Sequence, residues 1–91
     1  MAQRLHVIFS GRVQGVGFRY TAARLARQFS VTGYVKNLPD GTVETVAEGE
    51  KNELKAFLES LQSGAMRPNL RRADVTWSEA RGEFSAFDVV Y

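Results

Sequence analysis

The distribution of hydrophobic and polar positions along the chain predicts five β-strands and two α-helices. In the first strand, residues 5–10, the side chains of Leu5, Val7 and Phe9 fall on one side, as in a strand with one buried face. Further strands are predicted at residues 31–38, 42–48 and 74–78, and finally through Phe87, Val89 and Tyr91. Apolar residues at helical spacing occur twice, as Ala22, Leu25, Ala26, Phe29 and as Leu54, Phe57, Leu58, Leu61.

Turn-forming residues separate these elements. Pro39-Asp40-Gly41 is a strong turn signal, so the second and third strands are predicted to form a hairpin that Gly49 closes. Gly64 is predicted to end the second helix, and residues 65–69 to form a loop. No internal linker or repeat interrupts the sequence, so we expect residues 1–91 to form a single domain.

The order strand, helix, strand, strand, helix, strand predicts an α+β fold, the ferredoxin-like split βαβ sandwich (βαββαβ). Two helices would cover one face of a four-stranded antiparallel sheet, with a short extra strand at the end of the chain. In this arrangement we expect the second strand to lie beside the first. The architecture also occurs in RNA binders, metal chaperones and regulatory domains, so it does not by itself indicate a function.

The composition narrows the function classes. The chain has no cysteine and one histidine, which argues against disulfides, thiolate chemistry and most transition-metal sites. No apolar run is long enough to span a membrane and no secretion signal is evident, so we expect a cytoplasmic protein without a membrane partner. The net charge of +2 is too small to require a nucleic-acid partner. An RNA-binding sheet is also disfavoured, because the third strand has no aromatic residue and contains Glu44 and Glu48, which would repel phosphate.

A glycine-rich loop between the first strand and the first helix is the most informative feature. Gly11, Gly15 and Gly17 precede Arg19, which lies in the first turn of the predicted helix. Glycine lets backbone N–H groups converge, and a helix start adds unpaired N–H donors, so the loop is predicted to bind an anion of phosphate size. The spacing fits neither a Walker loop nor a dinucleotide-binding fingerprint. The alternative is a tight strand-to-helix turn with a surface arginine.

Few other side chains suggest chemistry. Asn37 lies at the end of the second strand and could position a water, although an asparagine at a turn entry is the commoner case. We assign no catalytic role to His6, and the conformational role of Asp40 in the Pro39-Asp40-Gly41 turn is a sufficient reason for its presence. The chain offers no thiol, no metal cluster, no histidine–carboxylate pair and no pair of carboxylates. A phosphoric–carboxylic anhydride fits this inventory, because its carboxylate leaving group, with a pKa of about 4–5, departs without a general acid.

Two motifs resemble those of the acylphosphatases. The first is Gly11-Arg12-Val13-Gln14-Gly15-Val16-Gly17-Phe18-Arg19; the second begins at Gly33-Tyr34-Val35-Lys36-Asn37 and continues through Gly41-Thr42-Val43 to Gly49. The resemblance implies a monomeric enzyme that hydrolyses acyl phosphates without metal or other cofactor, and that inorganic phosphate, its product, inhibits. It also implies that Arg19 binds the phosphoryl group and that Asn37 orients the attacking water. The backbone N–H groups of Gly15, Val16, Gly17 and Phe18 would hold the phosphate oxygens.

Two other function classes remain open at this point. Acylphosphatase-like domains also occur at the start of large hydrogenase-maturation proteins, where they are part of a longer carbamoyl-transfer system, and a domain that only binds phosphate is a third possibility. The acyl group of the substrate has no recognisable pocket in the sequence. Arg67, Arg71 and Arg72 could steer anions toward the site, but a solvated loop is the simpler interpretation.

Overall fold

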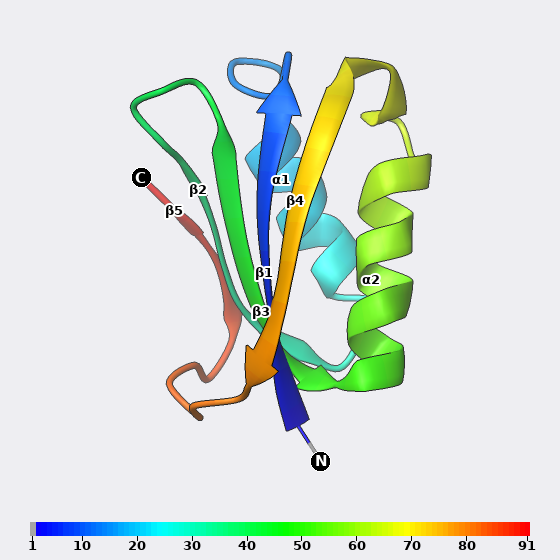
Figure 1. Cartoon of the computed structure of the whole chain (residues 1–91), viewed down its shortest axis with the longest axis vertical. Helices are drawn as coiled ribbons and strands as arrows, with labels where there is room; N and C mark the ends of the chain where they lie inside the picture. Colours follow the sequence, from blue (N-terminus) through cyan, green and yellow to red (C-terminus); the bar gives the residue numbers. More distant parts are fainter. Residues whose placement is uncertain (1) are drawn as a thin grey trace.

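Two helices pack on one face of a five-stranded sheet in the computed structural model, which describes residues 2–91 (Figure 1). The elements in chain order are β1 (Ala2–Gly11), α1 (Phe18–Ala26), β2 (Val31–Asn37), β3 (Val43–Glu50), α2 (Lys51–Ser63), a 3₁₀ turn (Arg67–Asn69), β4 (Leu70–Glu79) and β5 (Phe87–Val90). Within residues 2–91 there is no helix of the length and apolar character needed to cross a membrane.

The strands lie in the order β4-β1-β3-β2-β5, which confirms the ferredoxin-like α+β fold. The four strands of the βαββαβ unit pair in antiparallel fashion, as predicted, and the short extra strand β5 runs parallel to β2, with Val35 opposite Val89. One detail of the prediction is wrong, because β2 does not lie beside β1. The hairpin turn folds β3 back into the space between them, so β3 pairs with both neighbours. The first crossover, through α1, therefore spans two strand widths.

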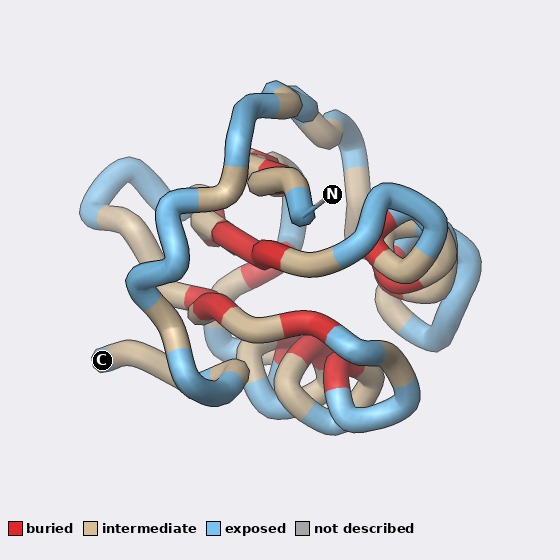
Figure 2. The backbone as a smooth tube through the Cα atoms, turned by 90° about the horizontal axis from the view of Figure 1, so that it is seen from below, coloured by how far each residue is buried: buried red, intermediate tan, exposed pale blue. Residues whose placement is uncertain are grey.

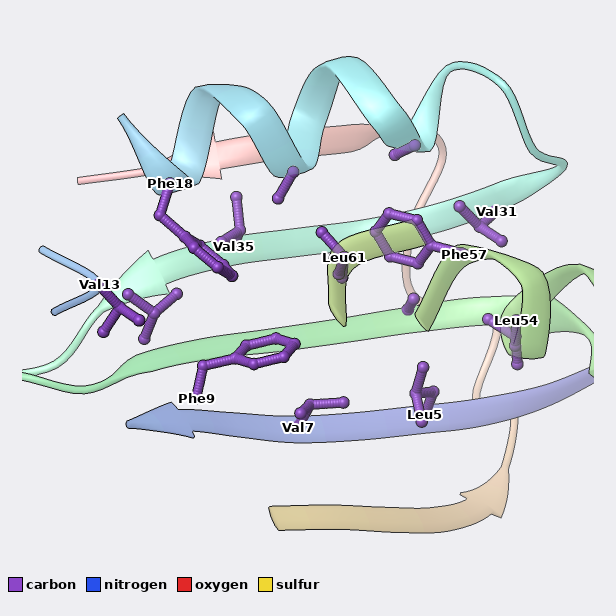
Figure 3. Packing of buried hydrophobic residues seen from close by; sticks show 14 residues of the cluster. Leu5, Val7, Phe9, Val13, Phe18, Val31, Val35, Leu54, Phe57 and Leu61 are labelled. Atoms are coloured by element: carbon purple, nitrogen blue, oxygen red, sulfur yellow. The ribbon is translucent and has the colours of Figure 1, made fainter. Parts of the chain in front are cut away.

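The core fills the space between the sheet and the helices (Figure 3). The alternation predicted for the first strand is confirmed, since Leu5, Val7 and Phe9 are fully buried. The helices contribute Phe18, Ala22, Ala26, Leu54, Phe57 and Leu61. Buried residues lie along the central strands and on the helices, whereas the connecting loops are mostly exposed (Figure 2). These surface loops, which connect the strands and helices, extend from the ends of this packed core.

Most element boundaries differ from the prediction by a few residues, and three of the differences bear on the packing of the sheet and helices. α1 ends at Ala26, and Phe29 lies in the turn that follows, where its N–H donates to the carbonyl of Ala26. The Phe29 ring still packs on the Phe57 ring, with 6.1 Å between their centroids. The apolar spacing therefore predicted correctly that Phe29 packs against the core, but it placed the end of the helix too late. β3 continues through Gly49 to Glu50, and β4 begins at Leu70, where it pairs with Gly11.

A seven-residue connection, residues 80–86, leads from β4 at one sheet edge to β5 at the other (lower end in Figure 1). Glu48 holds it in place. The Glu48 carboxylate is almost fully buried and accepts hydrogen bonds from the backbone N–H groups of Arg81 (2.8 Å) and Gly82 (3.0 Å). It also pairs with the Arg4 guanidinium at 2.9 Å. Because β5 follows directly, these bonds help to set where the last strand lies.

Candidate active site

The loop that joins β1 to α1, residues 12–17, is anchored at both ends and open in the middle. Val13 and Phe18 are buried, and the Phe18 ring packs on Phe9 with 5.1 Å between centroids. Between these anchors, Gly15 and Gly17 are exposed and have φ angles of +73° and +78°, in the region that favours glycine. A Cβ atom at either glycine would meet no atom within 4 Å. The positive φ angles at these two positions, and not a lack of room for a side chain, are what favour glycine there.

The start of α1 provides hydrogen-bond donors at this bend. Gly17 is the N-cap and makes no side-chain capping bond, and no acidic residue lies in the first turn. The first four N–H groups of a helix have no partner inside the helix, and the helix dipole adds partial positive charge at the same end. The first intrahelical bond here joins the N–H of Thr21 to the carbonyl of Gly17 (3.0 Å). The N–H groups before Thr21 are therefore suited to an anion.

Gln14 fastens the loop to the neighbouring hairpin. Its side-chain amide donates to the carbonyl oxygens of Leu38 (2.7 Å) and Thr42 (2.8 Å), at the two ends of the β2–β3 turn. The loop and the turn lie at the same end of the sheet, the upper end in Figure 1. The Gln14 bonds therefore fix the position of the glycine loop relative to Asn37, the last residue of β2.

The loop, the helix start and Asn37 enclose a cavity of about 190 Å³. Its lining residues are Val13, Gly15, Gly17, Phe18, Arg19, Tyr20 and Asn37. The Oδ1 atom of Asn37 is buried and accepts no hydrogen bond. A buried acceptor without a partner costs about 1–3 kcal/mol, so a hydrogen-bond donor beside this oxygen would be favoured.

Arg19 is held by the far end of the chain. Its Nη1 donates to the carbonyl oxygen of Val90 (3.2 Å), and its guanidinium lies over the ring of Tyr91, 4.7 Å from the ring centroid. The hydroxyl of Tyr91 in turn hydrogen-bonds to the hydroxyl of Tyr20. These contacts place one positive charge at the edge of the cavity. They leave other guanidinium N–H groups to face an anion.

The β2–β3 turn has a structural function. Asp40 accepts hydrogen bonds from the hydroxyl of Thr42 (2.6 Å) and from its N–H (3.0 Å), and these bonds lower the pKa of the Asp40 carboxyl below its usual range. This agrees with the conformational role predicted for Asp40.

His6 is paired, contrary to the prediction that the chain has no histidine–carboxylate pair. On the sheet face opposite the helices, His6 Nε2 lies 2.9 Å from Glu44 Oε2, and the hydroxyl of Tyr34 donates to the other Glu44 oxygen at 2.8 Å. Burial and the negative charge of Glu44 raise the pKa of Tyr34 to about 12. Sequence reasoning missed this pair because His6 and Glu44 are distant in sequence and meet only through the β1–β3 pairing. His6, Glu44 and Tyr34 do not line the cavity, so the structure gives no reason to assign His6 a role there.

Larger hollows lie elsewhere on the molecule. One of about 680 Å³ is lined by Arg12, Arg71 and the Pro68–Asn69 turn, and a smaller one of about 250 Å³ by Arg67, Arg71 and Arg72. Arg72 pairs with Asp74 (2.7 Å) on the exposed surface of β4. Among residues 2–91 there is no group of three or more histidine, aspartate or glutamate side chains arranged to hold a metal ion.

The structure brings the sequence-predicted residues together. Gly15, Gly17, Phe18, Arg19 and Asn37 line one cavity, and the partly buried Val16 lies between the two glycines. Sequence reasoning missed Gln14 as the link to the hairpin, although it is part of the first motif. It also missed Tyr20, Val90 and Tyr91 around Arg19. No local pattern indicates the last two, because Val90 and Arg19 are 71 residues apart.

Comparison with known proteins gives a consistent result. The family model described as Acylphosphatase matches residues 5–89. The acylphosphatase of Roseiflexus sp. (strain RS-1) is 41% identical over 88 residues, which cover 97% of this chain and 95% of that protein. The acylphosphatase of Thermococcus kodakarensis is 44% identical over 87 residues, covering 96% and 94%. The crystal structure of acylphosphatase from Bacillus subtilis superposes with a TM-score of 0.89 at 40% identity, over the whole of both chains.

Proposed function

The chain belongs to the acylphosphatase family and hydrolyses acyl phosphates, and we propose that it does so without a metal ion, by direct attack of a water molecule on phosphorus. In this proposal Arg19 and Asn37 are the catalytic residues. The backbone N–H groups of Gly15, Val16, Gly17 and Phe18, together with Arg19, bind the phosphoryl group.

The phosphoryl group is bound by the loop and the helix start. Two glycines in the left-handed region allow backbone N–H groups of the loop to face a common anion, and the first turn of α1 adds more donors and positive potential. Arg19 supplies a full positive charge at the same edge. Together they offset the negative charge of the three phosphoryl oxygens, and they do so without rearrangement during the reaction.

The unpaired Oδ1 of Asn37 is the observation on which the mechanism chiefly rests. It is buried, has no partner, and belongs to a residue that lines the cavity beside the loop. A water molecule that donates one hydrogen to Oδ1 has its oxygen lone pair free to face phosphorus. Asn37 would then contribute orientation, which for a well-placed reactant is worth several powers of ten in rate.

The chemistry needs neither a general acid nor a metal. The water oxygen forms a bond to phosphorus while the bond between phosphorus and the carboxyl oxygen breaks. The leaving group is a carboxylate with a pKa of about 4–5, so it departs unprotonated. The proton of the attacking water passes to a phosphoryl oxygen, and the products are the carboxylate and inorganic phosphate. What the site must supply is position and positive charge, which match the residues present.

Inorganic phosphate competes with the substrate, because it has the same oxygens for the same donors. The enzyme acts in the cytoplasm and as a monomer; the glycine loop, Arg19 and Asn37 of a single chain together line the cavity, so the proposed chemistry needs no residue from a second copy. Residues 1–91 act as a single acylphosphatase domain, which the family match over residues 5–89 supports.

Hydrolysis of benzoyl phosphate, followed by loss of its ultraviolet absorbance with and without a chelator, tests the proposal. We expect turnover that the chelator leaves unchanged and that inorganic phosphate inhibits competitively. Loss of activity with the chelator and recovery with magnesium or zinc would refute the metal-free mechanism. Binding of phosphate without turnover of any acyl phosphate would instead identify a binding module.

A further inference from the structure

Two exposed tyrosines lie at the edge of the cavity. In the described part of the chain the large hydrophobic side chains that are exposed are Tyr20 (59%), Val75 (38%) and Tyr91 (78%). Val75 lies on the edge strand β4, but Tyr20 lines the cavity and Tyr91 packs against Arg19. Exposed aromatic rings cost hydration free energy, so a pair of them beside a site is typical of a surface that a ligand covers.

The two rings are held in a fixed arrangement. Their hydroxyl groups hydrogen-bond to each other, and the guanidinium of Arg19 lies over one face of the Tyr91 ring at 4.7 Å. Tyr20 is also fixed by its place in the first turn of α1. The pair therefore presents an ordered aromatic surface, whose rings lose little further freedom when a ligand binds.

The size of the cavity indicates which part of the substrate meets this surface. At about 190 Å³ the cavity is smaller than the roughly 300 Å³ at which sites for whole small molecules begin. With the phosphoryl group on the N–H groups of Gly15 to Phe18, the acyl group has to project out of the cavity. Tyr20 lines that cavity and is more than half exposed, so it stands where the acyl group leaves.

We propose that Tyr20 and Tyr91 form the acyl-binding rim of the site, and that this rim favours acyl phosphates with a flat, apolar acyl group over those with a small one. The inference rests on the proposed function, because it assumes that the loop binds the phosphoryl group. A planar acyl group stacks on an aromatic ring, and such contacts are worth about 0.5–1.5 kcal/mol, or about 2- to 13-fold in affinity.

The simpler alternative is that both tyrosines only hold Arg19 in place. In that case their removal weakens the binding of every phosphoryl compound alike. The acyl-binding rim instead makes the loss depend on the acyl group. Comparing an aromatic with a small acyl group therefore separates the two explanations.

The kinetic test compares benzoyl phosphate with acetyl phosphate in wild type, Tyr20→Ala, Tyr20→Phe and the control Val75→Ala. We expect Tyr20→Ala to lower the ratio of kcat/KM for benzoyl to that for acetyl phosphate about 2- to 13-fold, mainly through KM. Tyr20→Phe, which keeps the ring, should preserve most of the ratio, and Val75→Ala should leave it unchanged. An unaltered ratio in Tyr20→Ala, or an equal loss for both substrates, would overturn the inference.

A binding test does not depend on turnover. Calorimetric titrations with phenylphosphonate and methylphosphonate should show tighter binding of the phenyl compound to wild type, and a reduced difference in Tyr20→Ala and Tyr91→Ala. Equal binding of the two phosphonates to wild type would refute the rim. If the wild type bound phenylphosphonate more tightly but hydrolysed no acyl phosphate, the proposed function would fail while the aromatic rim remained.

Discussion

The side-chain amide nitrogen of Gln14 lies 2.7 Å from the carbonyl oxygen of Leu38 and donates a hydrogen bond to it. The bond joins the glycine loop to the residue directly after Asn37. The two parts of the site come from different strand ends, with β3 between their strands. Gln14 is therefore a positioning residue: it fixes the distance between the groups that bind phosphate and the group that orients water.

Gln14→Ala should reduce kcat about 10-fold and stability by about 1–3 kcal/mol, because it removes two hydrogen bonds between the loop and the hairpin and frees the loop to shift. The carbonyl oxygens of Leu38 and Thr42 each keep a backbone N–H donor within the turn, so the turn itself should persist. Steady-state kinetics and urea unfolding measure the two effects. The matched control is Gln62→Ala, at an exposed position of α2. A Gln14→Ala enzyme with wild-type kcat would show that the loop holds its place without this link.

Asn37→Ala should lower turnover by at least ~10²-fold, about 2.7 kcal/mol of barrier, while phosphate still binds. The reason is that the variant keeps Arg19 and the loop but loses the acceptor for the attacking water. Benzoyl phosphate kinetics beside calorimetric phosphate titration check this, with thermal unfolding to confirm the fold. Near-normal turnover in this variant would show that Asn37 does not orient the attacking water and serves only as the residue that leads into the turn.

Arg19→Ala should reduce phosphate affinity and turnover together, because one charge serves both the bound phosphate and the transition state. Arg24→Ala provides the comparison, since Arg24 is an exposed cation on the same helix. The same titrations and kinetics apply. A fall in turnover with unchanged phosphate binding would mean that Arg19 acts only in the transition state.

Gly17→Ala should weaken phosphate binding about 10-fold, because alanine disfavours the φ of +78° on which the bend of the loop depends. Gly82→Ala is a close control: its φ is +68°, and a Cβ there also meets no atom within 4 Å. Both variants should lose about 1–2 kcal/mol of stability, but only Gly17→Ala should lose phosphate affinity. Equal phosphate affinity in the two variants would contradict the role of the loop.

Glu48→Gln should make the free energy of unfolding depend less on pH in the acidic range. Burial disfavours the charged form of Glu48, but the N–H groups of Arg81 and Gly82 and the guanidinium of Arg4 outweigh this and lower its pKa below 4.5. The unfolded chain therefore takes up a proton before the folded one does. The resulting stabilisation is present above pH 4.5 and is lost as the pH falls through the lower pKa of the folded state.

Urea unfolding between neutral pH and pH 3 measures this dependence. The variant should lose about 1–3 kcal/mol at neutral pH and less than the wild type on acidification. Glu59→Gln, on the exposed face of α2, controls for the change of charge. Parallel curves for Glu48→Gln and wild type would show that other carboxylates govern acid unfolding.

Periodicity predicted the elements well because the core imposes it. Leu5, Val7 and Phe9 alternate since one face of β1 meets the helices, and that burial is visible in the sequence. The order of the strands in the sheet could not be predicted in this way. No pattern within residues 31–48 indicates that β3 inserts between β1 and β2, because strand pairing depends on contacts across the whole sheet. The parallel pairing of β5 with β2 was missed for the same reason.

The site was predictable where it is local. Gly15, Gly17 and Arg19 lie within one short segment, and their chemistry follows from backbone freedom and charge. Asn37 came from a separate motif, and only the fold brings it to the same cavity. The contacts of Arg19 with Val90 and Tyr91 have no local pattern at all, because they depend on where β5 lies.

The bond between Arg19 and Val90 also has a consequence for the kinetics of folding. The two residues are 71 positions apart, so the guanidinium is fixed only when most of the chain has closed into a loop. Closing such a loop costs conformational entropy before its contacts are gained, which makes it a late step in a sheet with this topology. Helix formation needs only hydrogen bonds between residues four apart and is a much faster event. Recovery of full catalysis during refolding therefore follows the docking of the final strand and lags behind the recovery of helical signal.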